Sequence, residues 1–583
     1  MSEESNVMKM RHTLSHIMAA AIKNLYSDTT TIQFGIGPAI DNGFYYDIDF
    51  GDMKISEDNF GKIEKEMRKI IAQKLPLVRE EKSRAEALKW AEENGQKYKT
   101  EIINDLPEDE VISFYTLGDF TDLCRGPHVE DTGKVGAFKL EKVAGAYWRG
   151  DEKREMLTRI YGLAFETQEE LDEYEKKQEE AKQRDHRKLG RELDLFCFSD
   201  LVGSGLPMFT PRGTVLRNIL NDFAQSYRVK RGYQKVCIPH IALVDLYKTS
   251  GHYEKFPEML QFTSQESGDH LALKPVNCPH HSQIYASQPR SYKDLPIKYL
   301  ETTMVYRDER KGELGGLSRV RAITQDDSHV FCTEDQIGDI FGELIESAQD
   351  LYERIGMDLK LRLSFRDDGD GYTGTPEMWE KAQSAIQAMA DKYKIEYYIG
   401  IGEAAMYGPK MDFMATDALG REWQVATVQL DYATPTRFGL EYTDVDGSKK
   451  TPVMVHCALV GSIERFMSVL IEHTAGWFPF WMAPEQLRIL TVNDSVNEYV
   501  EKIKAELADF ELDIPVEHNK LRMTIDGRNE SLGKKIREAT KMKIPVVLIV
   551  GPKDVEAGEV SVRLRDSEQK IKLAELKDFL KKQ

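Results

Sequence analysis

The chain has 583 residues, 41% apolar and 30% charged, which predicts roughly three to five globular domains and excludes wholesale disorder or a collagen-like repeat. No apolar run approaches the ~20 residues that a membrane-spanning helix requires, the N-terminus has no apolar signal core, and the six cysteines form no CxxC pair, so we expect a reducing, cytoplasmic location. A net charge of −19 excludes nucleic-acid binding by charge alone, whereas residues 486–583 are nearly balanced in charge and fit an enzyme that binds RNA at a local basic surface.

Residues 1–165 have the pattern of a small α/β domain. We expect a helix from Met8 to Tyr26, followed by strands near Thr31–Ile36 and Gly43–Phe50. Residues 166–192 are rich in Glu and Lys at i,i+4 spacing, which predicts an exposed helix that connects this domain to the next.

Two segments of this first domain carry potential metal ligands. His12 and His16 are four residues apart and therefore lie on one face of the predicted helix. Far downstream, Cys124 and His128 follow Asp122 in a short segment. By residue type alone, the three imidazoles and the thiol could form a tetrahedral zinc site.

Residues 193–484 form the largest predicted unit and contain an arginine-rich strand–loop–strand segment at Glu301–Cys332. Arg307 and Glu309 end the first strand, a glycine-rich loop follows, and Arg319 precedes the second strand. A guanidinium group spans two phosphate oxygens and stays charged at neutral pH, so arginines beside such a loop favour triphosphate binding. Taken alone, the Arg-x-Glu pattern is more typical of a surface hairpin with incidental salt bridges.

Residues 485–583 alternate between strand-like and helix-like segments. We expect strands at Leu487–Thr491 and Pro545–Val550, and helices at Val496–Phe510 and Gly533–Lys541. This alternation predicts an α/β domain of common size.

Three motifs in the largest unit occur in a specific order. A helix and a strand that ends in proline span Leu216–Pro239, the Arg-x-Glu hairpin follows at Arg307, and Gly461-Ser-Ile-Glu-Arg465 opens an apolar helix. Together they resemble the signature motifs of class II aminoacyl-tRNA synthetases. Further segments narrow the resemblance to threonyl-tRNA synthetases, and the similarity extends from Arg11 to about Arg565. These segments are Asn277–Pro279, Thr324–His329, Tyr407–Asp412, Trp423–Gln424, Thr427–Asp431 and Val455–His456.

The resemblance implies a multidomain α+β fold. Its parts are an N-terminal α/β editing domain at 1–165, a charged linker helix at 166–192, an antiparallel-sheet catalytic core at 193–484 and an α/β anticodon-binding domain at 485–583. It also implies a homodimer formed through Leu216–Pro239. Longer family members carry a ubiquitin-like domain before the editing domain, and because the editing helix starts here at about Met8, we expect a short form without it.

The resemblance assigns a zinc ion to the catalytic core, with Cys278, His329 and His456 as ligands. Three protein ligands leave the metal open to substrate, and the family's zinc binds the amino and hydroxyl groups of threonine. A metal that demands a hydroxyl ligand rejects valine, which an apolar pocket of the same shape separates poorly. Asp327 is expected to accept a hydrogen bond from that hydroxyl.

The second substrate implied by the resemblance is ATP with Mg²⁺. Arg307, Arg465 and Arg319 are expected to neutralise the triphosphate while the threonine carboxylate attacks the α-phosphate. His252 is expected near the terminal ribose of tRNA during transfer, although an ordinary loop histidine is nearly as plausible. The other residues expected to orient substrate groups are Gln325, Glu309, Tyr407, Lys410, Gln424, Gln429 and Ser462.

The N-terminal segments resemble the editing domain shared by threonyl- and alanyl-tRNA synthetases, which in the threonyl branch is a metal-free hydrolytic site. Serine keeps the hydroxyl that satisfies zinc and lacks one methyl group, a difference of only ~1–3 kcal/mol, so hydrolysis of seryl-tRNA(Thr) is needed. The residues expected in this editing site are His12, His16, Cys124, His128, Asp122 and Lys99.

The last domain resembles the anticodon-binding domain of several class II synthetases, with tRNA(Thr) as the partner. Glu556 and Arg565 are expected to read base edges, and Arg528 is also expected to bind the anticodon. Lys534 and Lys535, which form a basic cluster with Arg537, are expected to bind phosphates.

Three other functions compete with this interpretation. A class II synthetase for serine or proline would not need the zinc residues and Asp327. A synthetase-like protein that only binds RNA would not need every phosphate-binding arginine. A separate editing protein would not need an intact ATP-binding core.

Overall fold

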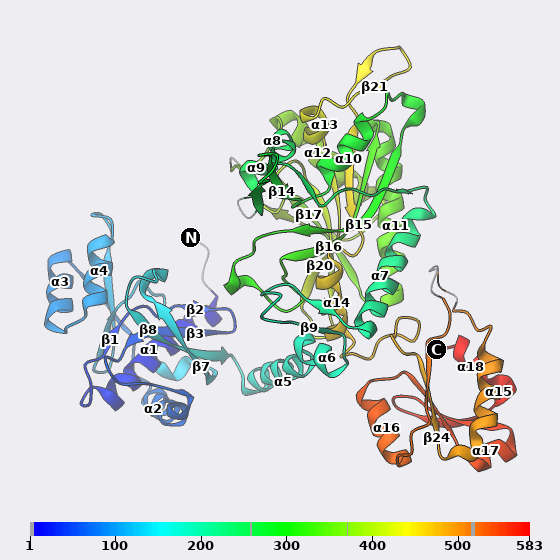
Figure 1. The fold of residues 1–583 in the computed structure, drawn as a ribbon. Helices are drawn as coiled ribbons and strands as arrows, with labels where there is room; N and C mark the ends of the chain where they lie inside the picture. The colour runs from blue at the N-terminus through cyan, green and yellow to red at the C-terminus, as the bar shows by residue number, and fades with distance from the viewer. Residues whose placement is uncertain (1–4, 257–258, 370, 513, 515–518) are drawn as a thin grey trace. The chain divides into compact units, whose positions relative to one another are not determined.

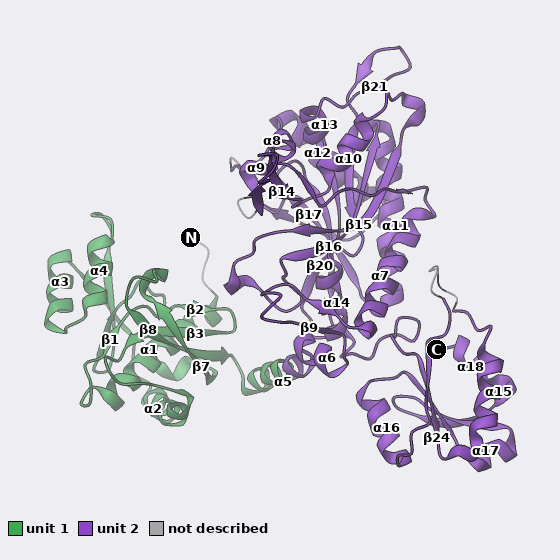
Figure 2. Cartoon of the chain, viewed as in Figure 1, with its two compact units in different colours: residues 1–179 green, residues 180–583 purple. Residues whose placement is uncertain are grey.

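The computed structural model describes residues 5–256, 259–369, 371–512, 514 and 519–583. The chain divides into two compact units, residues 1–179 and 180–583 (Figure 2). Within the described part, the structure has no helix that is both long and apolar enough to cross a membrane.

Unit 1 is built on helix α1 (Asn6–Tyr26), which Ser5 caps by accepting a hydrogen bond from the Met8 amide. The helix packs its apolar face against a five-stranded sheet in the order β1-β3-β8-β7, with β2 beside β3 (Figure 1). The strands are β1 (Gln33–Phe34), β2 (Ala39–Ile40), β3 (Gly43–Asp49), β7 (Ala137–Tyr147) and β8 (Met156–Phe165). The predicted helix and second strand are confirmed to within two residues at each end.

A smaller antiparallel sheet completes unit 1. Its strands are β4 (Val78–Lys82), β5 (Ile112–Leu117) and β6 (Phe120–Leu123). The accompanying helices are α2 (Phe60–Ala72), α3 (Arg84–Glu93) and α4 (Lys97–Asp105). The turn after β6 carries Cys124 and His128 back toward α1.

The prediction of one exposed linker helix at 166–192 is wrong in its second half. Helix α5 (Gln168–Arg184) is largely exposed, but it ends at Arg184. A second helix, α6 (His186–Glu192), begins after Asp185. The Asp185 carboxylate accepts a hydrogen bond from the Arg187 amide at 2.7 Å and so caps α6. Helix α6 packs against α14 (Ile463–His473) and buries His186 and Leu189. The high charge of the segment hides these buried positions.

The core of unit 2 is an eight-stranded sheet in the order β11-β15-β16-β23-β20-β19-β17-β18 (Figure 1). All neighbouring pairs are antiparallel except β11–β15 and β17–β18. The strands are β11 (Gln234–Lys235), β15 (Ile297–Tyr306), β16 (Ala322–Cys332), β17 (Leu359–Phe365), β18 (Tyr397–Ile401), β19 (Lys410–Thr416), β20 (Glu422–Asp431) and β23 (Val453–Ala458).

Four amphipathic helices share one large apolar core with this sheet: α7 (Pro211–Val229), α11 (Ile337–Ile355), α12 (Pro376–Lys392) and α14 (Ile463–His473). Shorter helices are α8 (Val244–Ser250), α9 (His252–Lys255), α10 (Cys278–Ala286) and α13 (Ala433–Arg437). Short strands outside the main sheet are β9 (Phe196–Cys197), β10 (Met208–Phe209), β12 (Ile241–Leu243), β13 (Gln261–Thr263), β14 (His270–Leu273), β21 (Tyr442–Thr443) and β22 (Lys449–Lys450).

The C-terminal part of unit 2 has its own five-stranded sheet, in the order β25-β24-β26-β27-β28. The strands are β24 (Leu487–Thr491), β25 (Met523–Asp526), β26 (Val546–Val550), β27 (Glu559–Arg563) and β28 (Glu568–Lys572), and the helices are α15 (Asn497–Leu507), α16 (Leu532–Lys541), α17 (Pro552–Ala557) and α18 (Leu576–Lys581). The predicted strands and helices are confirmed here to within three residues at each end.

Candidate active sites

Strand alternation places the predicted catalytic residues of β16 on one face of the sheet. Side chains two residues apart in a strand point the same way, so Gln325, Asp327 and His329 share a face. The antiparallel register pairs His329 with His456 of β23, and His456 with Gln429 of β20. Three neighbouring strands thereby present polar side chains at one point of a largely apolar sheet.

Helix α10 completes the predicted metal site with Cys278 at its first residue. The ligand atoms of Cys278, His329 and His456 lie within 4.8 Å of one another, and all three side chains are buried. The Cys278 thiol comes from a different segment than the two histidine strands, so the three donors meet only in the folded chain.

Buried polar groups orient both histidines. The Asp431 carboxylate lies 2.9 Å from His456 Nε2, and because a carboxylate only accepts, this nitrogen carries the proton and Nδ1 keeps a lone pair. His329 Nδ1 lies 2.8 Å from His281 Nδ1. Asp327 Oδ1 lies 3.8 Å from His329 Nε2, and Asn277 donates to the other Asp327 oxygen at 3.0 Å.

The donor set fits a zinc ion. One sulfur and two imidazole nitrogens are the ligands that Zn²⁺ prefers, and three of them leave a fourth position open. Burial raises the pKa of the Cys278 thiol well above its ordinary value and lowers the pKa of His329 well below its own. Without metal the Cys278 thiol and the His329 ring are therefore neutral, and a divalent cation would bind in exchange for the thiol proton.

Aromatic and imidazole rings line the space beside these ligands. The Tyr407 ring stacks on His456 with centroids 4.6 Å apart, and its hydroxyl donates to Gln429. His252 Nε2 lies 3.9 Å from Cys278 Sγ, and burial lowers the pKa of His252 to about 4, so the ring is neutral at physiological pH.

A buried carboxylate that the sequence analysis missed organises the next part of the pocket. Asp412 on β19 is fully buried and accepts hydrogen bonds from Lys410, Gln424 and Thr427, each at 2.9 Å, and from Arg362 at 3.0 Å. Lys410 and Gln424 are therefore held by Asp412. Asp412 lies in the segment Tyr407–Asp412, which resembles the family. That resemblance alone does not show which residue of the segment accepts hydrogen bonds from several neighbours.

The predicted ATP-binding residues lie on the loop 307–321 and at the start of α14. Arg319 pairs with Glu309 at 2.7 Å across this loop. Gln325 forms a backbone bridge with Ser462, which caps α14 by accepting the Arg465 amide hydrogen at 3.2 Å. The loop ends where β16 begins, and the N-terminus of α14 contacts β16 through Thr324 and Gln325, so both segments lie at the same end of this strand.

Unit 1 contains the second predicted site. His12 and His16 on α1 and His128 bring their rings together, with centroid distances of 4.2 and 4.5 Å to His128. Cys124 Sγ lies 3.3 Å from both His12 Nε2 and His128 Nε2. Burial raises the pKa of Cys124 to about 12 and lowers the pKa of His128 far below its ordinary value. At neutral pH the thiol is protonated and the His128 ring is neutral.

A cavity of about 340 Å³ opens onto His12, His16 and Cys124, and an ion pair lies at its wall. Lys99 Nζ lies 2.6 Å from Asp122 Oδ1, and both side chains are buried. Tyr46, which the sequence analysis missed, donates to Asp122 and accepts from Lys99 at 3.2 Å. Its inward position in the strand at Gly43–Asp49 follows from alternation, but its polar partners come from distant segments.

The three predicted anticodon residues do not form one cluster. Arg528 pairs with Asp526 and with Glu538, at 2.6 and 2.5 Å. Glu556 is exposed on α17, before β27, whereas Arg565 follows β27 and lies over the ring of Trp477 at 5.4 Å.

One predicted phosphate contact is wrong. Lys535 is buried and donates to the carbonyl oxygens of Thr491 and Asp526, at 2.9 and 3.1 Å. The Lys535 ammonium group therefore binds carbonyl oxygens at the ends of β24 and β25. Lys534 and Arg537 are exposed, so their assignment stays a prediction.

Comparison with known proteins identifies the parts of the chain. Three family models match: "tRNA synthetase class II core domain (G, H, P, S and T)" over residues 260–474, "Anticodon binding domain" over 486–583, and "Threonyl and Alanyl tRNA synthetase second additional domain" over 112–161. These matches cover the eight-stranded sheet except its edge strand β11, the C-terminal sheet, and the segment that contains Cys124 and His128.

Full-length relatives extend the similarity over both units. The chain is 50% identical to the threonine–tRNA ligase of Gloeobacter violaceus, over 98% of this chain and 91% of the relative, and 49% identical to that of Thermosynechococcus vestitus, over 97% and 93%. A crystal structure titled as the RNA binding domain of threonyl-tRNA synthetase from Cryptosporidium parvum is 34% identical, with a TM-score of 0.63, and covers 68% of this chain and 98% of that one. The chain therefore belongs to the threonine–tRNA ligase family of class II aminoacyl-tRNA synthetases, with a class II core for aminoacylation and an editing-associated additional domain.

Proposed function

We propose that Cys278, His329 and His456 hold one zinc ion per chain and that threonine is selected there by its hydroxyl group. The observation that carries this proposal is the convergence of three buried donors from α10, β16 and β23. When bound, zinc supplies a coordination position that only an amino acid with a suitable hydroxyl fills. Asp327 accepts a hydrogen bond from that hydroxyl, and Tyr407 covers the ligand His456.

For activation, ATP with Mg²⁺ binds beside the threonine site. Arg307 and Arg319 from the loop 307–321 and Arg465 from α14 bind the triphosphate, and Glu309 holds Arg319 in place. The threonine carboxylate oxygen attacks the α-phosphorus, the bond to the β-phosphate oxygen breaks, and pyrophosphate leaves. A hydroxyl of the terminal ribose of tRNA(Thr) then attacks the carbonyl carbon, and AMP leaves. Gln325, Gln424, Gln429, Lys410, Ser462 and His252 orient the reacting groups.

For editing, seryl-tRNA(Thr) enters the 340 Å³ cavity of unit 1. The rings of His12, His16 and His128 position the attacking water, while Lys99 and Asp122 hold the esterified serine. The same geometry also allows metal binding, because the ligand atoms of His12, His16, Cys124 and His128 lie within 4.8 Å of one another. We favour the metal-free reaction because this segment matches the additional domain shared by threonyl- and alanyl-tRNA synthetases, whose threonyl branch is metal-free by resemblance.

Three finer assignments complete the proposal. Glu556, Arg565 and Arg528 contact the anticodon stem-loop. Two chains associate through α7 and β11, and β11 supports this because it is an edge strand of the main sheet, open to a second chain. Location in the cytoplasm, expected from the cysteine content, stays a prediction.

The test is ATP–pyrophosphate exchange with threonine, serine and valine, before and after treatment with a zinc chelator, together with the metal content of each preparation. We expect exchange with threonine, weaker exchange with serine and none with valine, and loss of exchange on chelation with return on added zinc. Cys278→Ser should carry less zinc, whereas Cys124→Ser should keep one zinc per chain. Exchange that survives complete zinc removal would contradict the catalytic assignment, and two zinc ions per chain would contradict metal-free editing.

A further inference from the structure

A buried histidine of the linker helix α6 contacts the loop 307–321. His186 is 6% exposed, and both of its ring nitrogens have partners. Its Nδ1 lies 2.6 Å from Glu472 Oε1 on α14, and its Nε2 lies 3.0 Å from the backbone nitrogen of Leu317 in the loop. One imidazole therefore joins three segments: the linker, the loop and the helix that carries Arg465.

The partners fix the tautomer of this ring. A backbone N–H can only donate, so His186 Nε2 accepts from Leu317, and a carboxylate can only accept, so Nδ1–H donates to Glu472. Each side of the ring thus has a defined role. Because both nitrogens are used in hydrogen bonds, the cluster of Asp185, His186 and Glu472 is satisfied without a metal ion.

The loop is shaped to accept the imidazole ring. Gly316 has a φ of +59°, a conformation that favours glycine, and a Cβ atom built there would lie 2.3 Å from His186 Nε2. The backbone at Gly316 therefore approaches the ring more closely than any side chain allows.

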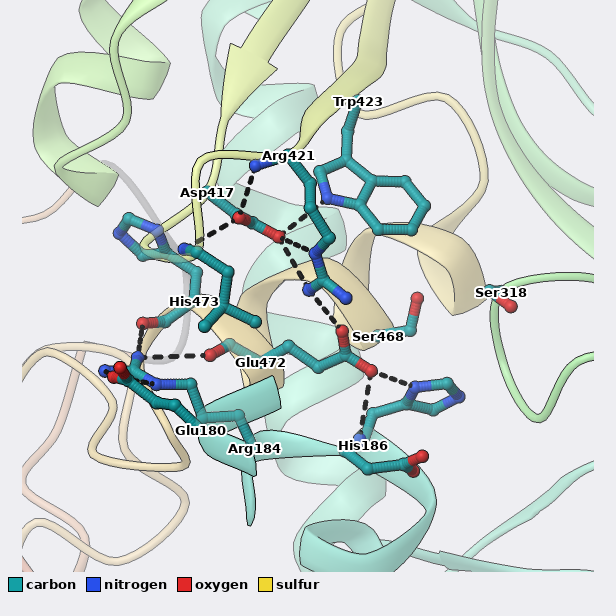
Figure 3. Close-up of polar contacts among 12 residues, drawn as sticks. Glu180, Arg184, His186, Ser318, Asp417, Arg421, Trp423, Ser468, Glu472 and His473 are labelled. Atoms are coloured by element: carbon teal, nitrogen blue, oxygen red, sulfur yellow. Dashed lines mark hydrogen bonds and ion pairs between the residues drawn. The ribbon is translucent and has the colours of Figure 1, made fainter. Parts of the chain in front are cut away.

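A series of contacts connects the other carboxylate oxygen of Glu472 with Arg465, the arginine of α14 in the proposed ATP site. Glu472 Oε2 pairs with Arg421 at 2.5 Å, and Arg421 pairs with Asp417 at 2.6 Å (Figure 3). Asp417 in turn accepts the Trp423 indole N–H at 2.9 Å. The guanidinium of Arg465 lies over the Trp423 ring at 5.9 Å. His186 and Arg465 are thus connected through Glu472 both along α14 and through this chain of polar contacts.

We propose that His186 is a positioning residue that holds the loop 307–321 in register with α14. With the loop in place, Arg319 and Glu309 on one side and Arg465 on the other face the same ATP molecule. The inference rests on the proposed ATP site, because it assigns a role to the scaffold of that site. It predicts that loss of the His186–Leu317 hydrogen bond weakens ATP binding and leaves threonine binding unchanged.

Two substitutions separate the two hydrogen bonds of the ring. In His186→Asn the amide nitrogen takes the place of Nδ1 and can still donate to Glu472, but nothing replaces Nε2. In His186→Gln the amide oxygen takes the place of Nε2 and can still accept from Leu317. The first variant therefore loses the loop contact, and the second keeps it.

We expect His186→Asn to raise the KM for ATP in pyrophosphate exchange about fivefold, the effect of one lost hydrogen bond, with the KM for threonine unchanged. Hydrogen exchange of the Leu317 amide, followed by mass spectrometry on full-length protein, should become faster. His186→Gln should restore the ATP KM to within about twofold and restore protection of Leu317. Gly316→Ala perturbs the contact from the loop side and should reproduce the ATP-specific defect without altering the histidine.

His270→Asn, at an exposed histidine of the same unit, is the matched control and should leave both KM values unchanged. A purely structural role for His186 would lower the fraction of active enzyme and leave both KM values and Leu317 exchange unchanged, which would overturn the inference. Equal rises in the two KM values would also overturn it. Arg465→Ala separates this inference from the assignment of the ATP site. If Arg465→Ala keeps the wild-type KM for ATP, the site assignment is wrong. If Arg465→Ala raises this KM but the His186 and Gly316 variants keep the wild-type value, only the positioning role is wrong.

Discussion

Replacing Asp431 with asparagine should weaken zinc binding although no zinc ligand is changed. One oxygen of Asp431 accepts the amide hydrogens of Ala433 and Thr434, both at 2.8 Å, and the other accepts from His456 Nε2 at 2.9 Å. In Asp431→Asn the remaining oxygen must face the two amides, because they can only donate. The new NH₂ group then faces His456 and forces its proton onto Nδ1, the nitrogen that keeps a lone pair in the wild-type chain.

The size of the effect follows from this change of tautomer. Loss of a group that orients a metal-binding histidine typically lowers affinity ~10–100-fold. Here the substitution also leaves two N–H groups facing each other whenever Nδ1 binds metal, in a place where Asp431 is fully buried. We therefore expect a loss near the upper end of that range, or about 3 kcal/mol.

Competition with a chromophoric zinc chelator measures this affinity directly, without reliance on activity. Asp554→Asn is the control, since Asp554 is also a buried aspartate that accepts a backbone amide hydrogen, from Gly551 at 2.9 Å. It should bind zinc as the wild type does. If Asp431→Asn matches the control, either His456 does not bind zinc or its tautomer is not set by Asp431.

Three further predictions concern other parts of the chain. Tyr46→Phe removes the hydroxyl that bridges Asp122 and Lys99 and should slow hydrolysis of seryl-tRNA(Thr) about tenfold or more with pyrophosphate exchange unchanged; a normal deacylation rate would exclude this hydroxyl from editing. Burial raises the pKa of Cys124 to about 12, so its thiolate fraction at pH 8 is roughly a thousandth of that of an ordinary thiol. Iodoacetamide should therefore label the exposed Cys197 before Cys124. Equal labelling rates of the two thiols would contradict the buried geometry. Asp326→Asn breaks a fully buried pair with Arg228 and should lower the free energy of unfolding of the catalytic part by about 3–5 kcal/mol in urea, and a loss below ~1 kcal/mol would refute this estimate.

Local pattern predicted individual elements in each part of the chain. The helix at Met8–Tyr26, the strand at Leu487–Thr491 and the apolar helix after Gly461 lie within two residues of where periodicity places them. The metal ligands came from resemblance, because Cys278 and the two histidines are far apart in the chain. Only the β16–β23 register and the position of α10 bring them together.

The partners of buried polar groups could not be predicted in this way. Asp412 and Asp431 each take their role from donors on other strands or on a following turn, and such pairings are invisible to periodicity. Lys535 shows the opposite error, since its charge and its neighbour Lys534 suggested solvent, while two strand carbonyls accept its protons. Where a charged residue finds a buried partner, composition predicts the wrong environment.

The pairing of His329 with His456 also determines where the chain can tolerate changes of length. One residue inserted in β23 before His456 would turn that side chain to the opposite face of the sheet and separate it from its partner. An insertion in the turn between β21 and β22 leaves the register of β16, β20 and β23 untouched. Tags, linkers or reporter domains are therefore best inserted at 444–448. The central strands of the sheet tolerate no change of length, because their register determines the distances between the site residues.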